Sequence, residues 1–262
     1  ADGYLYSETA FGDYPMFLPT EEKGTAVRPE WMLLSFHKPV TASSVKEDFG
    51  VENMVDEDAR TAWVANSNQE EWVQIDLLNP CQVCAIQVNY DEYGANQKGI
   101  VPGIYQSYVL SASKNGKDWY VIADKSQKKT DTPHEYIEFE LPFEARYIRW
   151  ENKAYTVSSN VSLREIRVFG KGHGAKPEAV QKLEAAWNPS DSCRCRLSWT
   201  PVNKADGYMV RYGISPDKLY TSFQVVGDST HLDLNGLNAG QTYYFSIAAY
   251  NENGVGPNLN LK

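Results

Sequence analysis

The stretch that decides the fold is EWVQIDL, residues 71–77, in which apolar residues occupy every second position. Successive side chains of a β-strand point to opposite faces, so this pattern predicts a strand with one buried and one exposed face. The buried face would carry Val73, Ile75 and Leu77, and the exposed face would carry Trp72, Gln74 and Asp76. A half-buried strand needs partners, which the rest of the chain supplies.

The same alternation recurs in YIEFEL (136–141), ARYIRWEN (145–152), LREIRVFG (163–170), GYMVRYG (207–213) and TYYFSIAAYN (242–251). Turn signals separate these runs, including KNGKD (114–118), SPDK (215–218) and NENGVGP (251–257). Sustained helical periodicity is hard to find. Many short strands with polar turns predict an all-β protein built from sandwiches.

Charge and composition narrow the classes of partner. The 262 residues carry a formal charge of -9, which disfavours nucleic acid and anionic membrane surfaces. Aromatic residues make up 13% of the chain, a content that suits β-sheet cores and also the stacking of a ring on a sugar. No apolar run approaches the roughly 20 residues that a membrane-spanning helix needs.

One linker divides the chain. The stretch GKGHGAKPE (170–178) follows a strand pattern and is small and polar, so we expect a boundary there. The predicted organisation is an N-terminal segment over residues 1–33, a first domain over 34–171, a linker over 172–176 and a second domain over 177–262. The glycines of the linker lack the βαβ context of a dinucleotide-binding fold.

The four cysteines, Cys81, Cys84, Cys193 and Cys195, match neither a zinc ribbon nor a disulfide framework. Cys193 and Cys195 share the parity of Leu197 in CRCRLSW, so we expect them to face a core. Cysteine usage leaves the cellular compartment open.

A resemblance covers residues 34–170. VTASSV (40–45), VENMVDEDARTAWVA (51–65), EWVQIDL, AIQVNY (85–90), YVLSASKNGKDWYVI (108–122), ARYIRWEN and LREIRVFG occur in the order found in coagulation-factor C-type, or discoidin, domains. That group includes carbohydrate-binding module family 32. The resemblance implies an eight-stranded jelly-roll β-sandwich.

Residues 177–262 resemble a fibronectin type III domain, an Ig-like β-sandwich. Trp199 in RLSWTPV and Tyr208 in ADGYMVRYG stand at the positions of its second-strand tryptophan and third-strand tyrosine. Leu237 and Tyr243 have the spacing of a tyrosine corner. No ligand chemistry is evident in this part, so we expect a spacer or a packing surface.

The two domains together resemble the C-terminal accessory region of a bacterial family 43 glycoside hydrolase, notably from Bacteroidota. By that resemblance residues 1–33 trail from a missing catalytic propeller that attacks xylan- or arabinan-type glycans. It implies a secreted, periplasmic or cell-surface protein, a polysaccharide or oligosaccharide ligand, a catalytic domain in cis and a monomeric state.

The chain itself lacks the signs of catalysis. Acids are plentiful, but runs such as Asp56/Glu57/Asp58 are typical of solvated turns, and the four histidines are scattered. Neither H-E-x-x-H nor G-x-S-x-G is present. We therefore expect a non-catalytic fragment of an enzyme.

The discoidin resemblance implies a structural Ca²⁺ at NMVDEDARTAW (53–63). A hard cation takes six or more oxygen ligands, and this turn offers Asp56, Asp58 and Thr61. The resemblance adds Glu165 from the last strand. The alternative is that the aspartates only cap the turn backbone.

The family binds sugars in loops at one end of the sandwich, here 43–50, 64–71, 90–106 and 153–162. Tyr93, Asn66, Asn96 and Tyr155 have suitable chemistry for a sugar site. Galactose-binding members usually carry a polar group directly after the tryptophan of T-x-W, where this chain has Val64. Two alternatives stay open: purely structural modules without sugar binding, and a discoidin-type adhesion protein.

Overall fold

A computed structural model describes residues 31–95 and 102–262. The chain forms two compact units, Ala1–His173 and Gly174–Lys262, and this division falls within residues 172–176. Strands dominate the described residues, whose only helical element is the 3-10 turn η1 (Val51–Met54). The all-β class is confirmed.

The first unit contains eight strands joined by hydrogen bonds in the order β1-β8-β4-β7-β5-β6, with β2 beside β4 and β3 beside β8. The strands are β1 (Met32–Leu33), β2 (Val40–Ala42), β3 (Trp63–Val64), β4 (Trp72–Tyr90), β5 (Gln106–Ser113), β6 (Tyr120–Asp124), β7 (His134–Tyr155) and β8 (Ser162–Lys171). The pairs are antiparallel.

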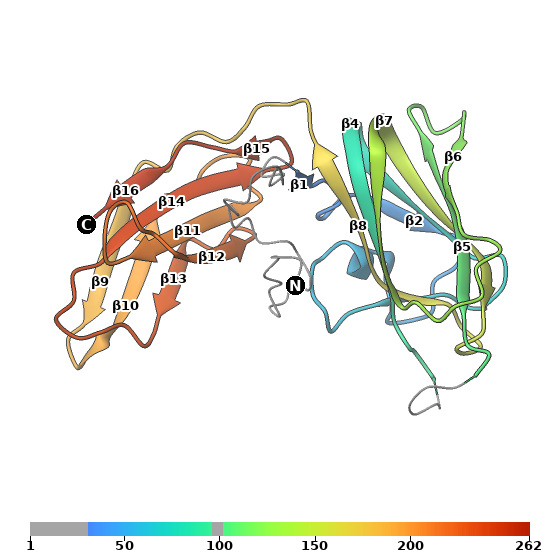
Figure 1. Cartoon of the computed structure of the whole chain (residues 1–262), viewed down its shortest axis with the longest axis horizontal. Coiled ribbons are helices and arrows are strands. Elements are labelled where there is room, and N and C mark those ends of the chain that lie inside the picture. Colours follow the sequence, from blue (N-terminus) through green and yellow to red (C-terminus); the bar gives the residue numbers. More distant parts are fainter. Residues whose placement is uncertain (1–30, 96–101) are drawn as a thin grey trace. The chain divides into compact units, whose positions relative to one another are not determined.

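The two longest strands, β4 and β7, lie side by side (Figure 1). Their pairing runs from Trp72↔Glu151 to Asn89↔His134, with register shifts between Asp76 and Cys81 and between Val83 and Ala85. Such irregularities bend strands and increase their twist, as a curved sandwich requires. The alternation predicted for residues 71–77 is confirmed, because the first positions of β4 alternate between half-buried and buried.

A β-bulge interrupts the end of β7. Tyr108 pairs with Asn152 and Ser107 pairs with Ala154, so Lys153 is an extra residue on β7. Trp150 and Asn152 point inward before the bulge, and Tyr155 is the next buried residue after it. The bulge therefore exchanges the faces of the strand.

The second unit is a two-sheet sandwich, with β13-β10-β9 in one sheet and β12-β11-β14-β15 in the other, where β16 also pairs with β14. The strands are β9 (Leu183–Asn188), β10 (Asp191–Trp199), β11 (Gly207–Gly213), β12 (Thr221–Val226), β13 (His231–Leu234), β14 (Tyr244–Asn251), β15 (Gly254–Val255) and β16 (Leu259–Leu261).

The residues that predicted this second sandwich lie in its core. Trp199 and Tyr208 are buried and their ring centroids are 5.3 Å apart. Leu237 and Tyr243 are also buried, and the Asn238 amide donates a hydrogen bond to the Tyr243 hydroxyl at 2.9 Å. This bond is the one a tyrosine corner makes.

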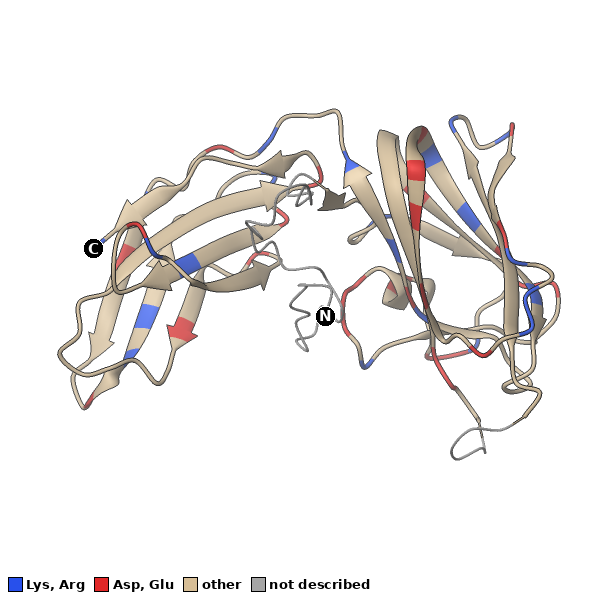
Figure 2. Cartoon of the chain, viewed as in Figure 1, with Lys and Arg blue, Asp and Glu red and all other residues tan. Residues whose placement is uncertain are grey.

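The cysteines lie mostly in the cores of the two units, and acidic and basic residues are mixed along the chain. Cys81, Cys84 and Cys195 are buried and Cys193 is half-buried. Figure 2 shows the positions of acidic and basic residues interspersed along the described strands and loops of each unit. Within the described ranges, no helix is long and apolar enough to cross a membrane.

Candidate functional site

Loops distant in sequence meet at one end of the first unit. The Asn160 side-chain amide donates to the Ala65 carbonyl at 2.8 Å, and the Tyr93 amide donates to Ser162 Oγ at 3.2 Å. The Asn66 amide donates to Ser44 Oγ at 2.9 Å. The described parts of the four predicted loops are therefore neighbours.

A buried carboxylate, Glu71, ties two of these loops to the start of β4. It is 5% exposed and accepts hydrogen bonds from the hydroxyls of Ser43, Ser44 and Ser67. The Ser67 amide adds a fourth, at 3.2 Å. A buried carboxylate is stable when its lone pairs are met in this way, so Glu71 gives the loops a defined position.

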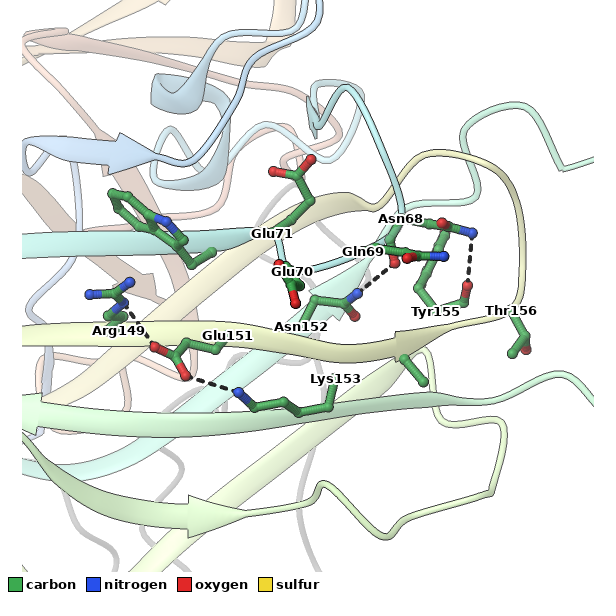
Figure 3. A pocket seen from close by; sticks show the side chains of 12 residues that line it. Asn68, Gln69, Glu70, Glu71, Arg149, Glu151, Asn152, Lys153, Tyr155 and Thr156 are labelled. Atoms are coloured by element: carbon green, nitrogen blue, oxygen red, sulfur yellow. Dashed lines mark hydrogen bonds and ion pairs between the residues drawn. The ribbon is translucent and has the colours of Figure 1, made fainter.

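A hollow of about 690 Å³ opens beside Glu71, between the loop that precedes β4 and the end of β7 (Figure 3). The loop side and the start of β4 contribute Asn68, Gln69, Glu70, Glu71 and Trp72, and β7 with its exit contributes Arg149, Glu151, Asn152, Lys153, Ala154, Tyr155 and Thr156. Two of the loops predicted for the sugar site, 64–71 and 153–162, thus form its walls.

An arginine between two indoles forms one end of the hollow. The guanidinium carbon of Arg149 lies 4.5 Å from the ring centroid of Trp72 and 5.9 Å from that of Trp119. Arg149 pairs with Gln74 across the strands, one step diagonally from Trp72. Cation–π contact holds both side chains in place, and Arg149 covers one face of the Trp72 ring.

Amide groups form the other end. Asn68 donates to the Ser158 carbonyl at 3.0 Å, and Asn152 donates to the Asn68 carbonyl at 2.8 Å. Asn152 Oδ1 is buried and has no hydrogen-bond partner among the described residues. Gln69 and Glu70 are exposed beside this network.

The charged groups on the β7 side are joined in one ion-pair network. Glu151 forms an ion pair with Arg149 at 3.1 Å and with Lys153 at 3.1 Å. Glu71 is held by serines, which leaves Glu70 as the exposed acid of the lining. The hollow thus combines an aromatic ring, amides and paired charges, a chemistry that suits polyhydroxylated ligands.

The predicted sugar residues are placed differently from one another. Asn66 is exposed but does not line the hollow, and Tyr93 is half-buried with its ring centroid 4.9 Å from that of Phe49. Asn96 lies outside the described residues.

Tyr155 lines the hollow but is only 3% exposed, and its ring stacks on Tyr90 with centroids 5.7 Å apart. Its hydroxyl donates to the Asp91 carbonyl at 2.8 Å, and burial raises the pKa of Tyr155 to about 12. The structure therefore places Tyr155 in the core, with no free face for stacking on a sugar.

In the predicted metal loop, oxygens of three residues converge. Asp56 accepts hydrogen bonds from the Asp58 amide at 2.9 Å and from the Thr61 hydroxyl at 2.8 Å. The same hydroxyl lies 2.9 Å from the Asp58 carbonyl oxygen. The Asp58 carboxylate is instead engaged by Arg60 through two contacts of 3.0 and 2.9 Å, and this hydrogen bonding lowers the pKa of Asp58.

Glu165 lies in a buried ion-pair network that the sequence did not indicate. Its Oε2 accepts from Asn89 at 3.2 Å and lies 3.0 Å from Arg167 Nη2. Arg167 is 2% exposed and also donates to Glu57 Oε1 at 2.9 Å. Glu57 adopts a φ of 61°, which turns the chain tightly at this point.

The buried network has two carboxyl groups and one guanidinium. Glu57 Oε2 and Glu165 Oε1 are buried without a hydrogen-bond partner in the described part of the chain. Burial raises the pKa of Glu165 and raises that of Glu57 to about 7. Two carboxylates sharing one guanidinium, with an unpartnered oxygen on each, fit a further cation.

These groups are compatible with the Ca²⁺ that the resemblance implies, though with a changed ligand set. The described residues hold no group of three or more His, Cys, Asp or Glu side chains placed for a metal. The oxygens that suit a hard cation are the Asp56 carboxylate, the Thr61 hydroxyl, the Asp58 carbonyl and Glu165 Oε1.

Several solved structures are similar to this chain. Chitosan-binding module 1 of a chitosanase/glucanase from Paenibacillus sp. IK-5 is 21% identical, with a TM-score of 0.45, and the match covers 53% of this chain and 99% of that one. The family 32 module of NanJ from Clostridium perfringens, solved with galactose, is 17% identical, with a TM-score of 0.44 and coverage of 53% and 98%.

A family 89 glycoside hydrolase from Clostridium perfringens is 22% identical, with a TM-score of 0.45. The match covers 54% of this chain and only 15% of that enzyme.

No curated protein matches the sequence. Residues 39–166 match the F5/8 type C domain family, and residues 178–260 match the fibronectin type III domain family. These matches agree with the two sandwiches and with the residues that predicted them. The chain therefore carries an F5/8 type C domain followed by a fibronectin type III domain.

Proposed function

We propose that this chain is the non-catalytic carbohydrate-binding region of a larger glycan-degrading protein. The observation that carries the proposal is the hollow, which presents Trp72, exposed Gln69 and Glu70, and the Arg149–Glu151–Lys153 charges on one surface of an F5/8 type C domain. Aromatic faces pack on the apolar faces of sugars, and fixed polar groups select their hydroxyls.

The acids of the hollow favour binding over hydrolysis. A glycosidase needs one carboxyl group to donate a proton and a second to act as nucleophile or base. Glu71 is held by serine hydroxyls and Glu151 by two cations, so both are committed to structure. Glu70 alone does not make a catalytic pair.

The proposal includes a structural Ca²⁺ at the loop that precedes β3. Asp56, Thr61, Glu165 and the main-chain carbonyl of Asp58 would hold it, and the ion would supply the positive charge that the buried acids lack. Its role would be to join the loop to β8, the strand that carries Glu165. The Asp58 carboxylate would stay with Arg60.

The wider setting follows the resemblance to family 43 accessory regions. We infer a secreted, periplasmic or cell-surface protein of Bacteroidota type, monomeric, with its catalytic domain upstream in cis and xylan or arabinan as the target. The fibronectin type III domain would act as a spacer, since its buried aromatic and aliphatic residues pack into its own core.

Affinity gel electrophoresis on xylan, arabinan and galactan tests the proposal. We expect retardation of the chain on xylan or arabinan and its loss in Trp72→Ala. Tyr220→Ala is the matched control, because Tyr220 is a 78% exposed aromatic residue of the other unit. Unretarded migration on all three glycans would favour purely structural modules, and equal retardation of Trp72→Ala would place the site elsewhere.

A further inference from the structure

The hollow is elongated along β7. Its lining on β7 runs from Arg149 to Tyr155, opposite Ser111 to Gln106 of β5, which at about 3.3 Å per residue corresponds to roughly 17 Å of strand. Figure 3 shows the labelled side chains spread along this strand, with Arg149 towards one end and Asn68, Tyr155 and Thr156 towards the other. A site for a single terminal sugar needs no such length.

The two ends of this strip offer different contacts. The half-buried indole of Trp72, held by Arg149, lines one end. At the other end is the exposed side chain of Gln69, next in the chain to Asn68, whose main-chain carbonyl accepts a hydrogen bond from the Asn152 side chain. Separate contacts at both ends suit a chain of sugars that reaches across the strip.

The charges of the strip select against acidic chains. Arg149 and Lys153 are the cations of the lining, and both pair with Glu151 at 3.1 Å. Exposed Glu70 adds a negative charge that has no ion-pair partner in the described part of the chain. The two cations are matched by two acids, Glu151 and Glu70, so a uronate would gain no net attraction from the strip, whereas a neutral sugar needs only its hydrogen-bonding groups.

We infer, on the basis of the proposed carbohydrate-binding function, that the ligand is the interior of a linear neutral polysaccharide lying along β7. Several sugar units contact the strip at once, from Trp72 to Gln69. The reducing and non-reducing ends of the chain take no part in recognition.

Isothermal titration calorimetry of the full chain with oligosaccharides of one to six units tests this inference. The probes are xylo-, arabino- and cello-oligosaccharides, with oligogalacturonates as the acidic series. We expect the dissociation constant of one neutral series to fall at least tenfold from one unit to four and then to level off. A tenfold fall corresponds to about 1.4 kcal/mol of binding free energy. Reduction of the terminal aldehyde leaves that affinity unchanged.

The outcomes separate this inference from the proposed function. Equal affinity for a monosaccharide and its hexamer overturns the inference and keeps the function, while absence of binding to every probe overturns both. Tighter binding of oligogalacturonates than of neutral chains overturns the neutral assignment.

Variants at the two ends localise the ligand. Trp72→Ala and Gln69→Ala each weaken hexamer binding more than dimer binding, and Tyr220→Ala changes neither. Gln69 is exposed, so its variant decides the matter even where Trp72→Ala does not fold. If neither variant reduces the dependence of affinity on oligosaccharide length, the placement of the ligand along β7 is wrong.

Discussion

Two buried acidic centres of the first unit stabilise their carboxylates in different ways. Glu71 accepts four hydrogen bonds from neutral serine groups and needs no counter-charge. Glu57 and Glu165 share Arg167, and each keeps one oxygen without a described partner. The first centre is complete as folded, whereas the second is short of positive charge and is the one that a cation would complete.

Removing the shared cation should give the largest effect. Arg167→Met leaves Glu57 and Glu165 buried together with no positive charge, a change that costs about 3–5 kcal/mol for buried pairs. Urea denaturation of the full chain measures it, with the unfolding of the second unit as internal reference. Arg146→Met, which breaks the partly exposed pair with Asp76, is the control. Equal losses in the two variants would contradict the special status of the buried network.

Calcium removal should act only on the incomplete centre. Saturating Ca²⁺ at 100 times its dissociation constant would stabilise the first unit by about 2.7 kcal/mol, and a chelator should remove that gain. Differential scanning calorimetry with Ca²⁺ or EDTA measures the shift, which Glu165→Gln should abolish. If EDTA leaves the melting temperature of the wild type unchanged, Arg167 alone balances the two buried acids and no calcium is bound.

Glu71→Gln should disturb the complete centre without touching the calcium response. The amide has one acceptor oxygen fewer and presents N–H groups to serine hydroxyls, which should cost about 1–2 kcal/mol. The same variant should weaken glycan binding, because the loop of Ser67 borders the hollow. Calorimetry with and without Ca²⁺ checks both, and a lost calcium shift would mean that the two centres are coupled.

The smallest effect is expected at Asp58. Its carboxylate is exposed and paired with Arg60, and its contribution to the cation site is the main-chain carbonyl. Asp58→Ala should therefore keep the calcium-dependent shift in melting temperature, whereas Asp56→Ala should lose it. The reverse result would restore the Asp58 side chain as a ligand.

Local patterns of the sequence were enough to predict the strands and both domain types. Alternation in residues 71–77 reports burial because it depends on one strand alone, and Trp199 with Tyr208 identifies the second sandwich in the same way. Trp72 was expected on the exposed face of its strand, which the structure confirms.

The hollow and the buried network depend on pairings that no local pattern contains. Arg149 reaches Trp72 only through the register between β4 and β7. Glu71 meets Ser43 and Ser44 from 28 and 27 residues away, and Arg167 meets Glu57 across 110 residues. Tyr155 was expected at the surface because a bulge at Lys153, which exchanges the faces of β7, leaves no clear mark in the sequence.

That bulge also gives the fold a simple route to new specificity. Deleting Lys153 would place Ala154 directly after Asn152, so plain alternation would keep Tyr155 facing the core and the wall of the hollow would lose one of its two cations. Inserting a residue there would instead lengthen the wall of the hollow while the pairing on either side stays in register. A one-residue change in length at this position would thus alter the wall of the hollow, and with it the glycan that is bound, while the sandwich stays unchanged.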